Sequence, residues 1–107
     1  MYVARDDVAT VEMLPGVRRR TLTSGERAMI CEISLDPGAV VPMHRHPHEQ
    51  VGTVLRGAIR MVIGGEERVC RPGDAYVVPP DVEHLGEALD EGAVVIDVFS
   101  PPREEYR

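Results

Sequence analysis

Several residue types that mark particular protein classes are scarce in this 107-residue chain. Only 2 cysteines are present, which fits a reduced cytoplasmic protein better than a disulfide framework. Basic residues number 12 against 18 acidic ones, and the net charge of −6 argues against nucleic-acid binding, because phosphate contacts require a basic surface. No long apolar stretch follows the charged start at Arg5, Asp6 and Asp7. We therefore expect neither a signal peptide nor a membrane span.

Tryptophan is absent and other aromatic residues are few, whereas valine is abundant and 10 glycines and 9 prolines recur at short intervals. Helical periodicity is weak throughout, and turn residues at this spacing are typical of many short strands. The chain contains no detectable linker, low-complexity tract or internal repeat. These features predict an all-β sandwich or barrel, with residues 1–107 forming a single domain.

Strands are expected where apolar and polar residues alternate or where short apolar runs occur. Tight turns are predicted at Leu55–Ala58 and Ile63–Glu66, where glycines separate two such runs. The charged tail, Pro101–Arg107, either is disordered or folds back over the mouth of a barrel. The expected strands are Val17–Leu22, Arg27–Ser34, Gln50–Leu55, Ala58–Ile63, Glu66–Val69, Ala75–Val78 and Ala93–Phe99.

All four histidines lie in two short segments, one holding His44, His46 and His48 and the other holding His84. An H-x-H pair places two imidazoles on the same face of a strand, because side chains alternate with a period of two. A third imidazole from a distant strand can complete a metal site with such a pair. The spacing therefore favours a metal centre over three unrelated surface or core histidines.

The two histidine segments resemble the two sequence motifs of the cupin superfamily. The first, Gly38–Gly57, is similar to G-x5-H-x-H-x3-E-x6-G, with Gln50 in the place of Glu. The second, from Gly73 through His84, is similar to G-x5-P-x-G-x2-H-x3-N, with Asp81 replacing Gly and Ala88 replacing Asn. Both motifs occur in order and at the separation that the superfamily shows.

The resemblance extends from Val17 to Phe99 and implies a cupin double-stranded β-helix, which is a jelly-roll barrel. It also implies one bound divalent transition metal ion. Imidazole and amide ligands suit Zn, Ni, Mn, Fe and Cu alike, so the ligand types leave the metal open. The ligands implied are His44, His46, Gln50 and His84.

Two further segments are similar to the KdgF-type cupins of pectin and alginate breakdown. They are His46–Gln50, in which Gln occupies the fourth ligand position of that group, and a D-x-F-x-x-x-R segment formed by Asp97, Phe99 and Arg103. The resemblance implies an enzyme that converts 4,5-unsaturated monouronates, left by polysaccharide lyases, to the open-chain keto form. It implies functional roles for Asp97, Phe99 and Arg103.

The residue chemistry agrees with an anionic sugar as the partner. Three neutral imidazoles and a neutral amide leave the charge of a divalent ion uncompensated, so the ion would be a strong Lewis acid that attracts a uronate carboxylate. Asp97 interrupts an apolar strand and shares a face with Val95 and Phe99. A carboxylate facing a barrel interior is costly unless paired or used, and burial would raise its pKa toward a general acid–base range.

Two other functions stay open at this point. A cupin dioxygenase using iron, copper or nickel is one, although Gln50 is less suited than Glu to stabilising an oxidised iron. A non-catalytic sugar-binding cupin is the other, although an anion pocket should not need the buried like charge of Asp97. Each residue also has a structural alternative: Gln50 beside a water ligand, Asp97 in a buried ion pair, Arg103 as a solvated charge and Phe99 in the core.

Several residues keep two interpretations. His48 is expected at the rim or behind the ligands, Tyr76 either packs in the core or reaches the cavity, and Cys31 and Cys70 are expected to be inert. The arginine run at residues 18–20 indicates a solvated strand end or a salt-bridging dimer contact. We expect a homodimer, because a small barrel can cover a sheet face or edge with a second copy.

Overall fold

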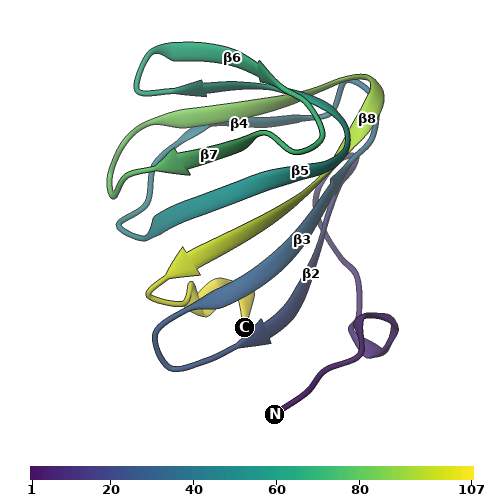
Figure 1. Ribbon diagram of the computed structural model, residues 1–107, viewed down its shortest axis with the longest axis vertical. Helices are drawn as coiled ribbons and strands as arrows, with labels where there is room; N and C mark the ends of the chain where they lie inside the picture. The colour runs from purple at the N-terminus through teal and green to yellow at the C-terminus, as the bar shows by residue number, and fades with distance from the viewer.

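The computed structural model describes residues 1–107 and contains eight strands, which confirms the predicted all-β class (Figure 1). Its two helices are single 3-10 turns, and neither has the length or hydrophobicity needed to cross a membrane. The assignment of the whole chain to one domain stays a prediction. The elements are η1 (Arg5–Asp7), β1 (Val11–Leu14), β2 (Val17–Ser24), β3 (Met29–Leu35), β4 (Val40–His44), β5 (Glu49–Ile63), β6 (Glu66–Cys70), β7 (Ala75–Val78), β8 (His84–Ser100) and η2 (Glu104–Tyr106).

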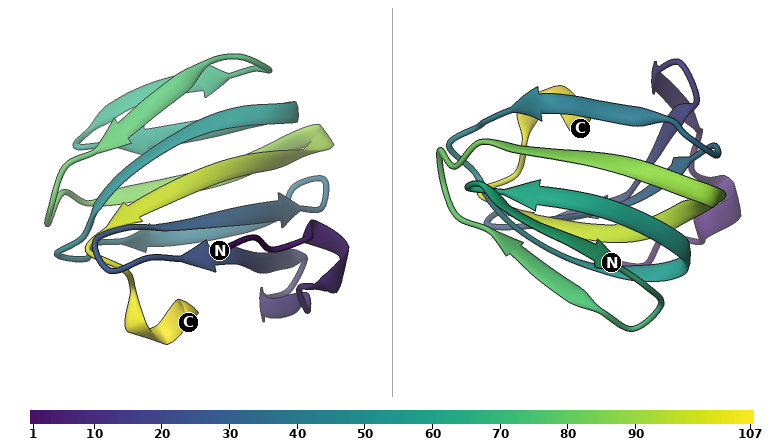
Figure 2. Two further views of the ribbon diagram at one scale, coloured as in Figure 1. Left: turned by 60° about the horizontal axis from the view of Figure 1, so that its bottom comes forward. Right: turned by 90° about the horizontal axis from the view of Figure 1, so that it is seen from above.

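Two long strands, β5 and β8, pair with each other and take part in both layers of the barrel (Figures 1 and 2). The strand order is β1-β2-β3-β8-β5-β6, with β4 paired to β8 and β7 paired to β5. The first half of β5 lies between β7 and the second half of β8, and the second half of β5 lies between β6 and the first half of β8. The curled sheet therefore encloses an interior into which alternate side chains point.

The predicted turn at Leu55–Ala58 is wrong, because β5 continues through it as one strand. The register against β8 shifts between Val54 and Arg56 and again between Gly57 and Ile59. Gly57 has a φ of +72°, and a Cβ placed on it would lie 2.0 Å from the carbonyl oxygen of Gly92. A glycine with positive φ serves a β-bulge as well as a turn, and here it bends the strand where β5 and β8 approach closely.

The predicted turn at Ile63–Glu66 is confirmed. Its central glycines have φ values of +55° and +83°, as a type I′ hairpin turn requires, and Ile63 pairs with Glu66. Strands β1 and β4 and the first half of β8 were missing from the prediction. The strand β4 is mostly exposed and contains Pro42, whereas the first half of β8 has small residues or His at its buried positions, so neither gives a strong apolar pattern.

The hydrophobic core lies between the two layers and reaches the floor of the cavity described below. Cys31 and Cys70 are buried free cysteines, and burial raises the pKa of both thiols, which agrees with the inert role expected of them. The largest core side chains come from β2, β3, β5 and β8: Val17, Met29, Ile33, Leu35, Val54, Ile59, Met61, Val95 and Phe99.

Candidate metal centre and cavity

Three imidazoles from two strands and a loop converge at one point. His44 ends β4 and pairs in register with His84 at the start of β8, while His46 follows two residues after His44. The ring centroids of His44 and His84 are 4.2 Å apart and those of His46 and His84 are 4.9 Å apart. One nitrogen from each of the three lies within 4.8 Å of the others, so the cluster could hold a divalent metal ion.

The three rings share one tautomer. The hydrogen-bond partner of each Nδ1 is a backbone carbonyl oxygen, which can only accept. Nδ1 therefore carries the ring proton, and Nε2 carries a free lone pair. The Nε2 of His84 is buried and has no hydrogen-bond partner, which is the environment of a ligand atom. The Nδ1–oxygen distances are 2.9 Å for His44 to Pro42, 3.0 Å for His46 to His48 and 2.9 Å for His84 to Val82.

Gln50 lies on β5 beside this cluster, with its Oε1 3.1 Å from the Nε2 of His46. Because the Nδ1 of His46 holds the ring proton, the Nε2 of His46 and the Oε1 of Gln50 are both acceptors. A cation bound by both atoms would stabilise their two lone pairs at this distance. Burial also lowers the pKa of His46, and it lowers the pKa of His84 to about 4, so both rings stay neutral as metal ligation requires. The donor set therefore fits a divalent transition metal.

His48 is not one of the three histidines whose ring nitrogens converge, and its backbone carbonyl orients the His46 ring. This placement agrees with the supporting position expected of it.

Asp97 is 6% exposed on the inner face of β8, and its Oδ1 accepts a hydrogen bond of 2.5 Å from the hydroxyl of Tyr76. Burial raises the pKa of Asp97 to about 6, against the opposing effects of hydrogen bonds from Tyr76 and Gln50 and the charge of Arg103. Asp97 makes no ion pair, so the structural alternative of a buried salt bridge is wrong. Tyr76, for which both packing and cavity positions were open, lines the cavity.

The tail folds back over the barrel, which is one of the two expected alternatives. The Arg103 side chain is 12% exposed, and its guanidinium carbon lies 5.2 Å from the Phe99 ring centroid and 4.2 Å from that of Tyr106. Thr21 donates a hydrogen bond to the carbonyl oxygen of Tyr106 and so ties the tail to β2. Arg103 is thus not a free solvated charge, and Phe99 is both a core residue and a wall of the cavity.

The expectation of a solvated strand end at the arginine run is wrong for its middle member. These residues lie within β2. Arg19 is two residues after the buried Val17, so it points inward, and it is 9% exposed. Its guanidinium carbon lies 4.5 Å from the Tyr106 ring centroid, and it has no carboxylate partner. Arg18, by contrast, points outward to Asp36 at 2.7 Å. Strand alternation from Val17 would have predicted this inward arginine.

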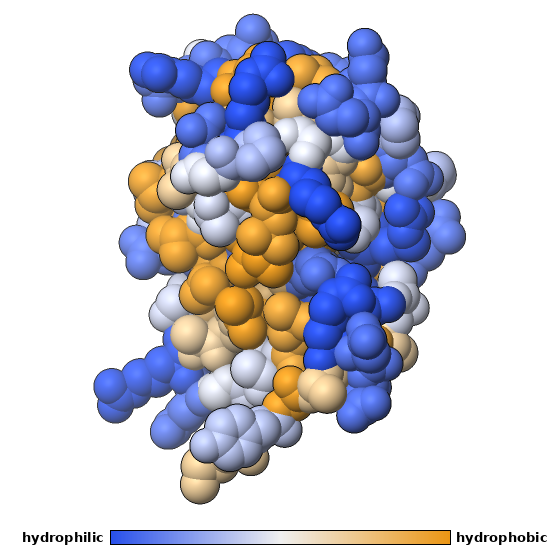
Figure 3. All heavy atoms as spheres, turned by 45° about the vertical axis from the view of Figure 1, so that its right-hand side comes forward, coloured by the Kyte–Doolittle hydropathy of each residue, from blue (hydrophilic) through white to orange (hydrophobic).

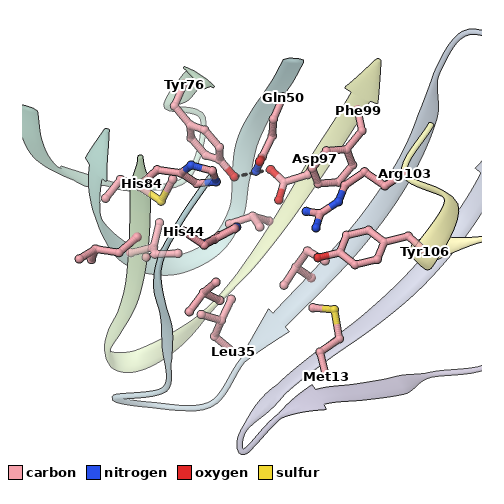
Figure 4. A pocket seen from close by; sticks show the side chains of 17 residues that line it. Met13, Leu35, His44, Gln50, Tyr76, His84, Asp97, Phe99, Arg103 and Tyr106 are labelled. Carbon is pink, nitrogen blue, oxygen red and sulfur yellow. Dashed lines mark hydrogen bonds between the residues drawn. The ribbon is translucent and has the colours of Figure 1, made fainter. Parts of the chain in front are cut away.

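One cavity, partly open to solvent, leaves about 70 Å³ of free space for the centre of a water molecule (Figure 4). The polar and aromatic side chains that line it include His44, Gln50, Tyr76, His84, Asp97, Phe99 and Arg103. Its floor is apolar, with Leu35 and Met13 among the contributors, and its polar groups gather at the opposite end. Figure 4 places His44 and His84 on one side and Arg103 with Tyr106 on the other, while Tyr76, Gln50 and Asp97 lie together between them. Such a cavity suits a small ligand with both an apolar and an anionic face.

Residues 31–99 match the protein-family model described as the cupin domain. The pectin degradation protein KdgF of Dickeya dadantii (strain 3937) is 33% identical over 106 residues, which cover 98% of this chain and 96% of that protein. This protein is a KdgF-type cupin. It superimposes on the structure of KdgF from Halomonas sp. with a TM-score of 0.94 and 32% identity, covering 100% of this chain and 98% of the other.

An RmlC-like cupin from Shewanella frigidimarina NCIMB 400 is also similar, with a TM-score of 0.94 and 30% identity over 99% of this chain and 95% of the other. The predicted cupin jelly roll is therefore confirmed for this KdgF-type cupin.

Proposed function

We propose that this KdgF-type cupin is an enzyme that opens 4,5-unsaturated monouronates to their linear keto form. The observation that carries the proposal is a buried carboxylate without an ion-pair partner, Asp97, in the cavity beside the three-histidine cluster. The likeness to a pectin degradation protein over almost the whole of both chains supports a uronate as substrate.

Four neutral side chains hold one divalent transition metal ion in this proposal: His44, His46, Gln50 and His84. When bound, the ion supplies Lewis-acid polarisation of substrate oxygens, with its full charge uncompensated by its ligands. The fixed Nδ1–carbonyl hydrogen bonds orient the three rings before the ion binds, so little side-chain ordering remains to be done.

The tail binds the anionic end of the sugar. Arg103 lies over two aromatic rings and faces the cavity, and its guanidinium can form two parallel hydrogen bonds to the uronate carboxylate. Phe99 provides an apolar wall for the sugar ring and supports the guanidinium from below. The tail, folded over the mouth of the cavity, also excludes water from the reacting atoms.

Asp97 moves the proton. As a carboxylate it removes the proton of the anomeric hydroxyl, whose oxygen electrons form the aldehyde while the C1–ring oxygen bond breaks. The pair from that bond goes to the ring oxygen and gives an enolate. Asp97 then returns the proton to C4, and the enolate becomes the C5 ketone. Substrate and product are isomers, so no other reactant is consumed.

The direct test mixes purified protein with unsaturated galacturonate and follows loss of the absorbance of the conjugated acid. We expect loss of absorbance with the metal-loaded protein, none with the chelator-stripped protein, and recovery when metal is returned. Oxygen uptake is recorded in the same reaction, because consumption of oxygen by the metal-loaded protein would indicate a dioxygenase. A metal-loaded protein that binds the uronate without changing it would instead indicate a sugar-binding cupin.

The same proposal includes a homodimer. Aliphatic side chains gather on the outer face of β3, β8, β5 and β7, where Val51 pairs with both Val77 and Val98, and Val98 pairs with Ile30. Val51 and Val77 are 42% and 51% exposed, and an apolar band crosses the face of the molecule drawn in Figure 3. A second copy would cover this face. Light scattering should report a dimer, and a monomer at every concentration would contradict it. The cytoplasmic location stays a prediction.

A further inference from the structure

Three residues on neighbouring strands form one row across the inner face of the sheet. Gly52 on β5 pairs in register with Tyr76 on β7 and with Asp97 on β8. The central strand separates the other two by two strand spacings, which is roughly 9–10 Å. The side chains of Tyr76 and Asp97 can therefore meet only by passing over Gly52.

Gly52 is required for that meeting. A Cβ at this position would lie 2.3 Å from the Oδ1 of Asp97 and 2.5 Å from both the Cζ and the hydroxyl oxygen of Tyr76. Any other residue would push the two side chains apart. Gly52 does not have a positive φ, so its role is to leave space for the two side chains that meet above it.

The contact over Gly52 occupies one oxygen of the carboxylate. The Tyr76 hydroxyl donates to Oδ1 of Asp97 at 2.5 Å, a length typical of a hydrogen bond to a charged acceptor. The hydroxyl makes no other hydrogen bond. In Figure 4 the second oxygen of Asp97 points away from Tyr76, toward the open part of the cavity. Gln50 also donates to this carboxylate, but the Tyr76 hydroxyl binds Oδ1 specifically and leaves Oδ2 turned toward the cavity.

We propose that Tyr76, seated over Gly52, is a positioning residue that anchors Oδ1 of Asp97 and leaves Oδ2 as the only oxygen that exchanges protons with the substrate. This inference rests on the proposed function, since it concerns the same proton transfers. Tyr76 does not touch the substrate in this arrangement. It fixes the rotation of the carboxylate, so that one oxygen faces the anomeric hydroxyl and, after ring opening, C4. A carboxylate free to rotate would present that oxygen in only part of its orientations.

The test is a double-mutant cycle of Tyr76→Phe and Asp97→Asn in the metal-loaded protein, assayed on unsaturated galacturonate. In the parent, Tyr76→Phe should lower kcat by about 10- to 100-fold, as expected when a reacting group is misplaced by about 1 Å. KM and metal content should stay unchanged, because neither the substrate clamp nor a ligand is altered. In the Asp97→Asn background the same change should lower kcat by less than about twofold, because the group that Tyr76 positions is absent.

Gly52→Ala gives a second route that leaves both side chains in place. Its Cβ should separate the pair and lower kcat as Tyr76→Phe does, whereas the control Gly25→Ala, whose Cβ meets only an ordinary contact at 3.6 Å, should keep the parent kcat. If Gly52→Ala does not fold, the double-mutant cycle decides alone.

Equal losses for Tyr76→Phe in both backgrounds would assign it a purely structural role and overturn the inference, as would full kcat in Tyr76→Phe beside an active parent. An inactive parent would overturn the proposed function and this inference together.

Discussion

The two sides of the cavity are held in place in different ways. On the histidine side (His44, His46 and His84), each ring is oriented by a backbone carbonyl two residues away in the chain. On the carboxylate side, Asp97 is held by Tyr76, 21 residues away, and Arg103 rests on aromatic rings of the strand and the tail. The orientation of each histidine ring is thus set locally once β4 and β8 pair, whereas the carboxylate side forms only when β5, β7, β8 and the tail assemble. Changes on the carboxylate side should therefore alter catalysis while leaving the metal bound.

The largest effect should come from Asp97→Asn. The substitution is nearly isosteric and keeps an oxygen that can accept from Tyr76, so fold and metal content should persist. Loss of the proton-transferring group should lower kcat by roughly 10²–10⁴-fold. Steady-state kinetics on unsaturated galacturonate, with metal content measured by mass spectrometry, tests this. A variant with close to the parent rate would make Asp97 structural and assign the proton transfer to another group.

The buried carboxylate should also be visible in the stability of the metal-free protein. The folded-state pKa of Asp97 is raised to about 6 from an ordinary 3.8, so its contribution to stability is fully present below pH 4 and is lost as the pH rises through 6. By linkage, the loss amounts to roughly 3 kcal/mol by about pH 8. Asp97→Asn removes this loss. Its free energy of unfolding relative to the parent should therefore rise by that amount between about pH 4 and pH 8.

Urea unfolding in the presence of a chelator measures the difference in free energy of unfolding between Asp97→Asn and the parent. Taking this difference cancels the contributions of the other titrating groups. A difference that is constant across the pH range would contradict a raised pKa for Asp97.

The same contrast explains what could be predicted from the sequence. The spacing of His44, His46 and His84 is local information, and matching it to two motifs also predicted the barrel. The Tyr76–Asp97 contact depends on the register of three strands, which no local pattern contains. The predicted turn at Gly57 is wrong because turns and β-bulges both use glycines with positive φ, and the local sequence does not distinguish them.

Arg103 should have the next largest effect, and on binding more than on the chemical step. Arg103→Gln removes the charged donor for the uronate carboxylate, and a hydrogen bond between charged groups is worth about 10- to 100-fold in affinity. We expect a KM higher by that factor with the metal retained. The control is Glu105→Gln, which removes the exposed partner of Arg103 at 3.2 Å but leaves the guanidinium over its rings. If both variants raise KM equally, the ion pair rather than the guanidinium itself is what matters.

Gln50→Glu tests the histidine side through its charge. The substitution lowers the net charge of the ligand set by one unit and adds a second carboxylate near Asp97, so an anionic substrate should bind more weakly. We expect KM to rise by about 3- to 10-fold at equal metal content. An unchanged or lower KM would show that neutrality of the fourth ligand does not tune this site.

The smallest effect should come from Arg19, which packs against Tyr106 in a neighbouring hollow that shares Arg103 and Tyr106 with the cavity, and which has no carboxylate partner. A buried cation without a partner attracts an anion before it reaches Arg103, and this attraction weakens with added salt. Arg19→Gln should therefore lower kcat/KM by about two- to fivefold at low ionic strength and much less at high ionic strength. Arg18→Gln is the matched control. It removes the same charge from the next residue in the chain, whose side chain points outward and is already paired with Asp36. Equal losses in the two variants would show that only the net charge of the protein matters, and that the inward arginine has no part in guiding the substrate.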